Sequence, residues 1–340
     1  MRPESLRMKL GCSYFGNRIL THVRSDMQEL VDMGCTYVVH TFNENDWLFY
    51  HDTIREIVSI SREVGLEVHI DPWGVGKVFG GESFSNFVMQ NVDAMQMVSD
   101  GKPVGSACPN HPKFRQFMKD WIDAAVYTEA DVLFWDEPHF YLPGWMGGRP
   151  NTWGCRCTVC AEKFEAATGS PLPQEEDDRV RHFKEDSITE FLAELVAYSH
   201  EKGKRNSLCV LPLRDESHST ANWNRLAGIP KLDIFGTDPY WFAFKKDMPE
   251  FVGTTCDQVH EVCRDHKLDH QVWLQGYKTP AGRENELVEA VRLMLDKGIR
   301  DIAVWGFQSC GFMSWIRPDN PALAWQKVKE AFRLAKDYKA

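Results

Sequence analysis

Short apolar runs alternate with stretches of helical periodicity along the whole chain, and this alternation limits the possible folds more than any other feature. Each run predicts a buried strand, and the apolar residues that follow at helical spacing predict a helix. The eight predicted strands are residues 8–12, 35–39, 66–70, 131–135, 207–213, 232–236, 271–274 and 301–304. Eight consecutive strand–helix units predict an α/β protein of the (β/α)8, or TIM barrel, class.

The chain has 340 residues, more than the roughly 250 that such a barrel typically needs. We therefore expect one domain over residues 1–340 with loop insertions, one of them at about 138–176, after the fourth strand. Glycines precede four of the predicted strands, where a helix C-cap favours a left-handed residue: Gly34, Gly65, Gly203 and Gly298. A doubly wound open sheet is the alternative, because alternation alone does not distinguish an open sheet from a closed one.

Charge and hydropathy exclude several classes of partner. The chain has 39 Lys and Arg against 49 Asp and Glu, a net charge of −10, and such a protein does not attract phosphate backbones or anionic lipid. No run approaches the roughly 20 apolar residues of a membrane helix, and the N-terminal residues lack an apolar signal-peptide core. We therefore expect a cytoplasmic protein that binds neither nucleic acid nor membranes. A homo-oligomer stays open, since no predicted helix identifies an interface.

Polar and aromatic side chains collect where the predicted strands end. In barrels the reacting groups lie on the loops that follow the strands. The candidate catalytic residues are Asp71, Asp136, Glu137 and Asp238, and the candidate substrate-binding residues are His40, Trp47, Trp73, Tyr141, Arg214, Tyr240, Trp241, Gln275, Tyr277 and Trp305. Aromatic faces stack on pyranose rings while polar groups bind hydroxyls, so this set predicts a carbohydrate site. For each single ring, packing at the barrel top is the alternative.

Glu137 is the strongest candidate for a catalytic acid. It ends the fourth predicted strand between Asp136 and Pro138, where partial desolvation raises the pKa of a carboxyl group. Adjacent strand residues point to opposite faces, so we expect only one of Asp136 and Glu137 to face the centre. Asp238 is the first candidate for the second carboxylate, with Asp71 or Asp136 next. A turn that only caps the loop is the alternative for each of them.

The glycine-rich segment 74–81 follows the third predicted strand. It matches neither the dinucleotide-binding fingerprint nor the P-loop, so we expect a mobile loop that contacts substrate rather than a phosphate site. Lys278, just past the seventh predicted strand, is a weak candidate for acid–base or Schiff-base chemistry.

Three cysteines, Cys155, Cys157 and Cys160, form a C-x-C-x2-C motif directly before a helical stretch. Thiolates at this spacing can bind one zinc ion, which takes four tetrahedral ligands in structural sites. Cys108 is the best candidate for the fourth ligand, with His111 and His139 behind it. The sequence therefore predicts a structural zinc that staples the insertion after strand four, and no organic cofactor.

These residues together resemble glycoside hydrolase family 42, the bacterial β-galactosidases of clan A. Members of that family place Cys-Pro before the helix that leads to strand four, a catalytic glutamate at the end of strand four and C-x-C-x2-C in the next loop. Cys108-Pro109, Glu137 and the three later cysteines follow the same order, within residues 108–164. The resemblance implies that Glu137 is the general acid/base and that the zinc is structural.

Two positions depart from the pattern of that family. Asp136 stands where its members carry asparagine, and Gln275 stands at the end of strand seven, where they carry the nucleophilic glutamate. An amide cannot be that nucleophile. We therefore expect a glycoside hydrolase-like enzyme for a small glycoside or oligosaccharide, with Glu137 as acid/base and an unusual second carboxylate. The alternatives are a non-catalytic sugar-binding barrel and a metal-dependent sugar isomerase or aldolase.

Overall fold

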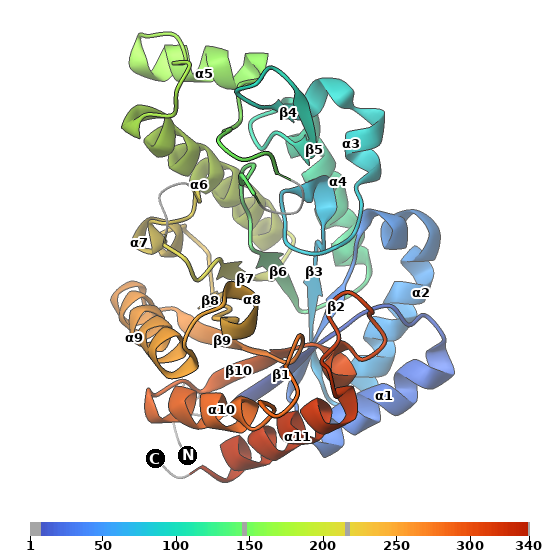
Figure 1. Cartoon of the computed structure of the whole chain (residues 1–340). Coiled ribbons are helices and arrows are strands. Elements are labelled where there is room, and N and C mark those ends of the chain that lie inside the picture. Colours follow the sequence, from blue (N-terminus) through green and yellow to red (C-terminus); the bar gives the residue numbers. More distant parts are fainter. Residues whose placement is uncertain (1–7, 145–147, 215–217, 339–340) are drawn as a thin grey trace.

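The computed structural model describes residues 8–144, 148–214 and 218–338, and its centre is a closed barrel of eight parallel strands (Figure 1). The barrel strands are β1 (Lys9–Tyr14), β2 (Tyr37–Thr41), β3 (Glu67–Asp71), β6 (Val132–Asp136), β7 (Arg205–Val210), β8 (Ile234–Thr237), β9 (Asp269–Gln275) and β10 (Asp301–Trp305). β1 pairs with β10, with Leu10 opposite Ile302, and this pairing closes the barrel. The prediction of a (β/α)8 barrel is confirmed, and the open-sheet alternative is wrong.

Helices surround the barrel on its outer side (Figure 1). The longer ones are α1 (Leu20–Asp32), α2 (Glu44–Glu63), α4 (Pro112–Tyr127), α6 (Asp178–Glu201), α9 (Met248–His266), α10 (Glu286–Asp296) and α11 (Pro321–Asp337). The shorter ones are α3 (Asn86–Gln90), α5 (Thr158–Thr168), α7 (Trp223–Ala227) and α8 (Trp241–Phe244). The four glycines that precede strands all have φ between 77° and 99°, as the C-cap prediction requires. None of the helices within the described ranges combines the length and apolar character needed to cross a membrane.

Two insertions lie against each other at one end of the barrel, where Figure 1 shows β4, β5 and α5. Between β3 and α4, β4 (Met95–Met97) and β5 (Pro103–Ala107) form an antiparallel pair. Val98 forms a bridge with Gly154 of the insertion after β6, and the Gln96 side chain accepts the backbone N–H of Tyr141 at 2.9 Å. The insertion after strand four was predicted. The β4–β5 pair was not, because three-residue and glycine-containing strands carry too little alternation to be recognised.

Side chains fill the barrel interior, and its polar groups form a network near the N-terminal ends of the strands. The Tyr37 hydroxyl donates to Asp301 Oδ1 at 2.6 Å and accepts from Gln271 Nε2 at 2.9 Å. Gln271 Oε1 in turn accepts from Trp273 Nε1 at 2.9 Å. Because buried polar groups are costly without partners, this chain of bonds lets the interior include a carboxyl group.

We predict that Asp301 makes the stability of the protein depend on pH. Burial raises the pKa of Asp301 to about 7, although the Tyr37 hydrogen bond and the Lys9 charge oppose the rise. An aspartate in the unfolded chain titrates near pH 4, so the folded state retains a proton that the unfolded state loses. The Asp301 contribution is therefore fully present below about pH 4 and is lost as the pH rises through about 7.

The variant Asp301→Asn keeps an oxygen for the Tyr37 hydroxyl but carries no charge. We expect it to reduce the loss of unfolding free energy between pH 5 and pH 8 by about 2–3 kcal/mol. Urea unfolding of both proteins near pH 5 and pH 8 measures this difference. An equal loss in the two proteins would contradict the prediction.

Candidate functional site

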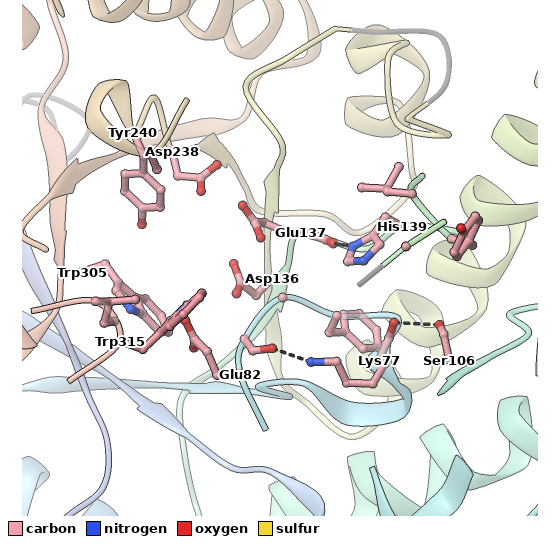
Figure 2. A pocket seen from close by; sticks show the side chains of 18 of the residues that line it. Lys77, Glu82, Ser106, Asp136, Glu137, His139, Asp238, Tyr240, Trp305 and Trp315 are labelled. Carbon is pink, nitrogen blue, oxygen red and sulfur yellow. Dashed lines mark hydrogen bonds between the residues drawn. The ribbon is translucent and has the colours of Figure 1, made fainter. Parts of the chain in front are cut away.

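A pocket of about 660 Å³ lies at the C-terminal ends of the barrel strands (Figure 2). Four carboxylic acids line it, namely Glu82, Asp136, Glu137 and Asp238. Its aromatic lining consists of Phe79, Phe84, Tyr141, Tyr240, Phe244, Trp273, Tyr277, Trp305 and Trp315. The pocket therefore combines an acidic centre with aromatic walls, in the position where barrels carry their reacting groups.

Glu137 follows the last residue of β6, and its backbone leaves the extended conformation at this point. Its φ of 38° lies in the left-handed region, and its N–H donates to the carbonyl of Cys209 on β7 at 2.9 Å. Asp136 and Glu137 consequently both line the pocket. The expectation that only one of them would face the centre is wrong, because the rule of alternating faces ends where the strand conformation ends.

Gly80, in the loop after β3, packs against both of these carboxyl groups. Its N–H donates to the Asp136 carbonyl at 2.9 Å. A Cβ atom at this position would lie 2.5 Å from Asp136 Oδ2 and 2.9 Å from Glu137 Oε2, so any larger residue would displace both carboxyl groups. Both oxygens lie this close to one point, and their separation therefore cannot exceed the sum of the two distances, about 5.4 Å.

Glu44, near the start of α2, holds this loop in place. Its Oε1 accepts hydrogen bonds from the Gly76 N–H at 2.9 Å and the Ser85 hydroxyl at 2.6 Å. Its Oε2 accepts the Phe87 N–H at 2.6 Å. One buried carboxylate thus pins both ends of the segment that carries Gly80. The sequence predicted a loop that reaches the site, but not the residue that restrains it.

The carboxyl groups of Glu137 and Asp238 face each other, and Figure 2 shows the two side chains pointing toward one another. Burial raises the pKa of Glu137, and its interaction with Asp238 opposes the rise. Burial, followed by the Glu137 charge, raises the pKa of Asp238 well above its usual range. Two carboxyl groups in contact do not ionise together readily, so the pair retains a shared proton to higher pH than either group would alone.

Asp71 and Asp136 add two more acidic groups to the same region. Asp71 ends β3, is fully buried and has no hydrogen-bond partner for either carboxyl oxygen among the described residues. Burial and the Glu137 charge raise its pKa, and burial and the Asp71 charge raise the pKa of Asp136. Four carboxyl groups from three strand ends thus lie close enough to affect one another's pKa, although Asp71 is not among the lining residues of the pocket.

The predicted substrate-binding residues fall into two groups. Those that line the pocket are Tyr141, Tyr240, Tyr277 and Trp305. Those that are not among its lining residues are His40, Trp47, Trp73, Arg214, Trp241 and Gln275. Trp73 lies beside the site and stacks on Phe15 with ring centroids 5.3 Å apart, whereas the Arg214 side chain is exposed.

Three residues of the second group have partners in the helical layer. The His40 ring lies 2.8 Å from the Ser61 hydroxyl of α2, and burial lowers its pKa to about 3. Trp47 packs against an aromatic residue of α4. Trp241 is fully buried and donates from Nε1 to Glu286 Oε2 at 2.9 Å. These side chains position the elements around the pocket.

Gln275 is fully buried and uses its whole amide on backbone groups. Its Oε1 accepts the N–H groups of Phe242 at 2.9 Å and Ala243 at 3.4 Å. Its Nε2 donates to the Tyr277 carbonyl at 3.1 Å. The amide therefore joins the end of β9 to α8, at the position where the family with similar motifs carries its nucleophile.

Several pocket residues were missed by the sequence analysis, among them Lys77, Glu82, His139, Trp273 and Trp315. Lys77 belongs to the glycine-rich segment, and the interior position of Trp273 follows from the two-residue period of β9, so both had a usable signal. Trp315 lies in the loop after β10, whose sequence has no pattern that indicates a wall of the pocket.

The four predicted metal ligands come together, although none of them lines the pocket. The Sγ atoms of Cys108, Cys155, Cys157 and Cys160 all lie within 4.8 Å of one another. The Cys108 sulfur is 3.4 Å from that of Cys160 and 3.6 Å from that of Cys157. Asn110 Nδ2 also donates to the Cys160 sulfur at 3.3 Å. This cluster links the start of α4 to α5 and could bind a metal ion.

No known protein family matches the chain, and no curated protein sequence does so either. Solved structures do match it. The catalytic domain of a β-amylase from Paenibacillus polymyxa is 12% identical, with 95% of this chain and 97% of that chain covered and a TM-score of 0.66. An endo-1,4-β-mannanase from Rhizomucor miehei is 11% identical, with 98% and 96% covered and a TM-score of 0.64. A D-allulose 3-epimerase from Methylomonas sp. is 10% identical, with 97% of both chains covered and a TM-score of 0.52. At these identities the likeness shows the barrel fold alone.

We predict that Gln275→Glu destabilises the protein. The substitution replaces the Nε2 donor with an oxygen that faces the Tyr277 carbonyl, and an unsatisfied buried polar group costs about 1–3 kcal/mol. Thermal unfolding of the variant, compared with Gln326→Glu at an exposed site on α11, measures the effect. Equal melting temperatures for the two variants would contradict the assigned role of Gln275.

Proposed function

We propose that the protein is a glycoside hydrolase that acts on a small glycoside or a short oligosaccharide. The observation that carries this proposal is the pair of facing carboxyl groups of Glu137 and Asp238 in a pocket with aromatic walls. Cleavage of a glycosidic bond needs an acid that protonates the leaving oxygen, and a carboxyl group with a raised pKa can serve as that acid near neutral pH. The rings offer faces on which pyranose units stack.

In this proposal Glu137 is the general acid and Asp238 is the group with which it shares its proton. In this arrangement Asp238 interacts with the acid itself, so it is a less suitable nucleophile than its place in the sequence suggests. Asp136 fits that role better. Its Oδ2 lies no more than about 5.4 Å from Glu137 Oε2, and this upper limit favours the short spacing of about 5–5.5 Å in retaining enzymes over the roughly 6.5–9.5 Å of inverting ones.

The proposed reaction follows from these roles. Glu137 transfers the shared proton to the leaving oxygen while an oxygen of Asp136 attacks the anomeric carbon. Water then cleaves the glycosyl ester, and its proton returns to Glu137. Burial and the charge of Glu82, which also lines the pocket, raise the pKa of Glu137 and so favour its protonated form before the sugar binds.

Gln275 favours a second candidate function, a barrel that binds sugars without cleaving them. The usual nucleophile is replaced by an amide whose bonds are all made to backbone. A metal-dependent isomerase has no comparable support. Within the described residues, the four cysteines form the one group of three or more His, Cys, Asp or Glu side chains whose ligand atoms converge, and the pocket carboxyl groups form none.

We also propose that the cysteine cluster binds a structural zinc ion, as in the family that the motifs resemble. A tetrahedral zinc with bonds of about 2.3 Å separates its sulfur ligands by about 3.8 Å, close to the observed spacings of 3.4 and 3.6 Å. The backbone N–H of Cys157 donates to the Cys155 sulfur at 3.4 Å, as expected for a thiolate ligand. Four sulfur ligands leave no position for substrate, so the role of the metal is to hold the insertion.

The catalytic proposal predicts that Glu137→Gln abolishes most of the activity. We expect wild-type protein to hydrolyse at least one member of a panel of aryl glycosides and disaccharides, with retention of the anomeric configuration by NMR. Loss of a general acid should lower kcat/KM by about 10²- to 10⁴-fold. Glu82→Gln makes the same change at another pocket carboxyl and should cost less than about tenfold.

Two results would contradict this assignment. Equal effects of Glu137→Gln and Glu82→Gln would show that Glu137 has no special role. Sugar binding by calorimetry without hydrolysis of any panel member would favour the binding barrel.

The zinc proposal predicts about one zinc per chain by elemental analysis of protein purified without chelators. Cys160→Ser should remove most of the metal and lower the midpoint of thermal unfolding, because one of the four ligands, and with it the metal link from α5 to the start of α4, is lost. Cys35→Ser removes a buried cysteine outside the cluster and should leave the metal content unchanged. Wild-type protein without metal, or Cys160→Ser with full metal content, would contradict the proposal.

A further inference from the structure

The pocket carries more negative charge than a pair of catalytic carboxyl groups requires. Three basic residues also line it, but each has other contacts. Arg149 is bonded to Asp100, with Nε 2.6 Å from Oδ2. Lys77 Nζ donates to the carbonyls of Gly81 at 2.7 Å and Ser83 at 3.2 Å. The third is the exposed Lys278, whose ammonium lies 5.4 Å from the centre of the Trp315 ring.

No basic side chain of the described residues forms an ion pair with Asp71, Asp136, Glu137 or Asp238. Buried carboxylates are unfavourable unless a proton or a cation neutralises them. Two of these acids have carboxyl oxygens without a hydrogen-bond partner in the described part of the chain. Asp238 lines the pocket, is 2% exposed and has no partner for Oδ1, and both oxygens of the fully buried Asp71 lack partners among the described residues.

Aromatic rings surround the same space. Figure 2 shows Tyr240 beside Asp238, and Trp305 and Trp315 on the side of the pocket nearest Asp136. The face of an aromatic ring attracts a cation, most strongly where water is excluded. Unpaired carboxyl oxygens together with ring faces form an environment that suits an ammonium group. A divalent metal fits less well, since no three His, Cys, Asp or Glu ligand atoms converge in the described part of this pocket.

We infer that the pocket binds a substrate that carries an ammonium group, an amino sugar or a glycoside of one, with its N–H groups donating to the carboxyl groups of Asp136 and Asp238 that line the pocket. This inference rests on the proposed function, because it specifies which class of sugar the same site takes. The bound ammonium supplies the positive charge that the chain itself does not place there. The carboxyl groups of the pocket release some of their bound protons when the cation binds. The affinity for the amine therefore rises with pH until the amine itself loses its charge.

Calorimetry of the wild-type protein tests the inference with matched ligands. The probes are glucosamine, galactosamine and mannosamine, each compared with its parent hexose and its N-acetyl derivative. We expect at least one amino sugar to bind about tenfold or more tightly than both neutral counterparts, with weaker binding at high salt. Titrations in buffers of different ionisation enthalpy should show proton release on binding. A parent hexose that binds as tightly as its amine overturns the inference but leaves a sugar site, and therefore the proposed function, intact.

Two variants test which residues of the pocket interact with the charged amine. Asp136→Asn should lower the affinity for the amine about tenfold more than the affinity for the parent hexose, because the amide keeps the size and polarity of the side chain but not its charge. Lys278→Met removes a positive charge from the pocket rim and should increase amine affinity without affecting the hexose. An unchanged preference in Asp136→Asn overturns the assigned contact. Amine binding that disappears with EDTA and returns with Mn²⁺ overturns the inference in favour of a bound divalent metal.

Discussion

The pairing of β1 with β10 is the interaction on which the rest of this structure depends. An open sheet would spread the ends of β3, β6 and β8 along one edge, whereas closure brings them around one axis. The carboxyl groups at these ends then lie close enough to raise one another's pKa and to share protons. The chemistry proposed for the pocket is therefore a consequence of closure as much as of the residues themselves.

The acidic centre shows how strand geometry and loop geometry combine. Asp136 faces inward because it lies two residues after Phe134, an interior residue of β6, and Glu137 joins it because its backbone turns into the left-handed region. Gly80 then packs where a side chain would collide with both. The charge gathered in this way has no cation of its own in the described chain, which connects the proposed acid catalysis with the inferred preference for an ammonium ligand.

The residues that could be predicted are those whose role depends on local pattern. Apolar runs located all eight barrel strands, and the position of Glu137 after such a run identified it as a pocket residue. Cysteine spacing anticipated the cluster. The roles of His40 and Gln275 could not be predicted, since they depend on partners that only the folded chain brings near, Ser61 in one case and the backbone of α8 in the other.

The contacts of Glu44 bear on how far the parts of this barrel are modular. Loops at the strand ends of such barrels are often regarded as exchangeable units, each carried by its own strand and helix. Here the loop after β3 takes its shape from a carboxylate at the start of α2, which belongs to the preceding unit. A chimera that transplants this loop alone would leave its anchor behind, so the smallest portable piece of the site spans two consecutive units.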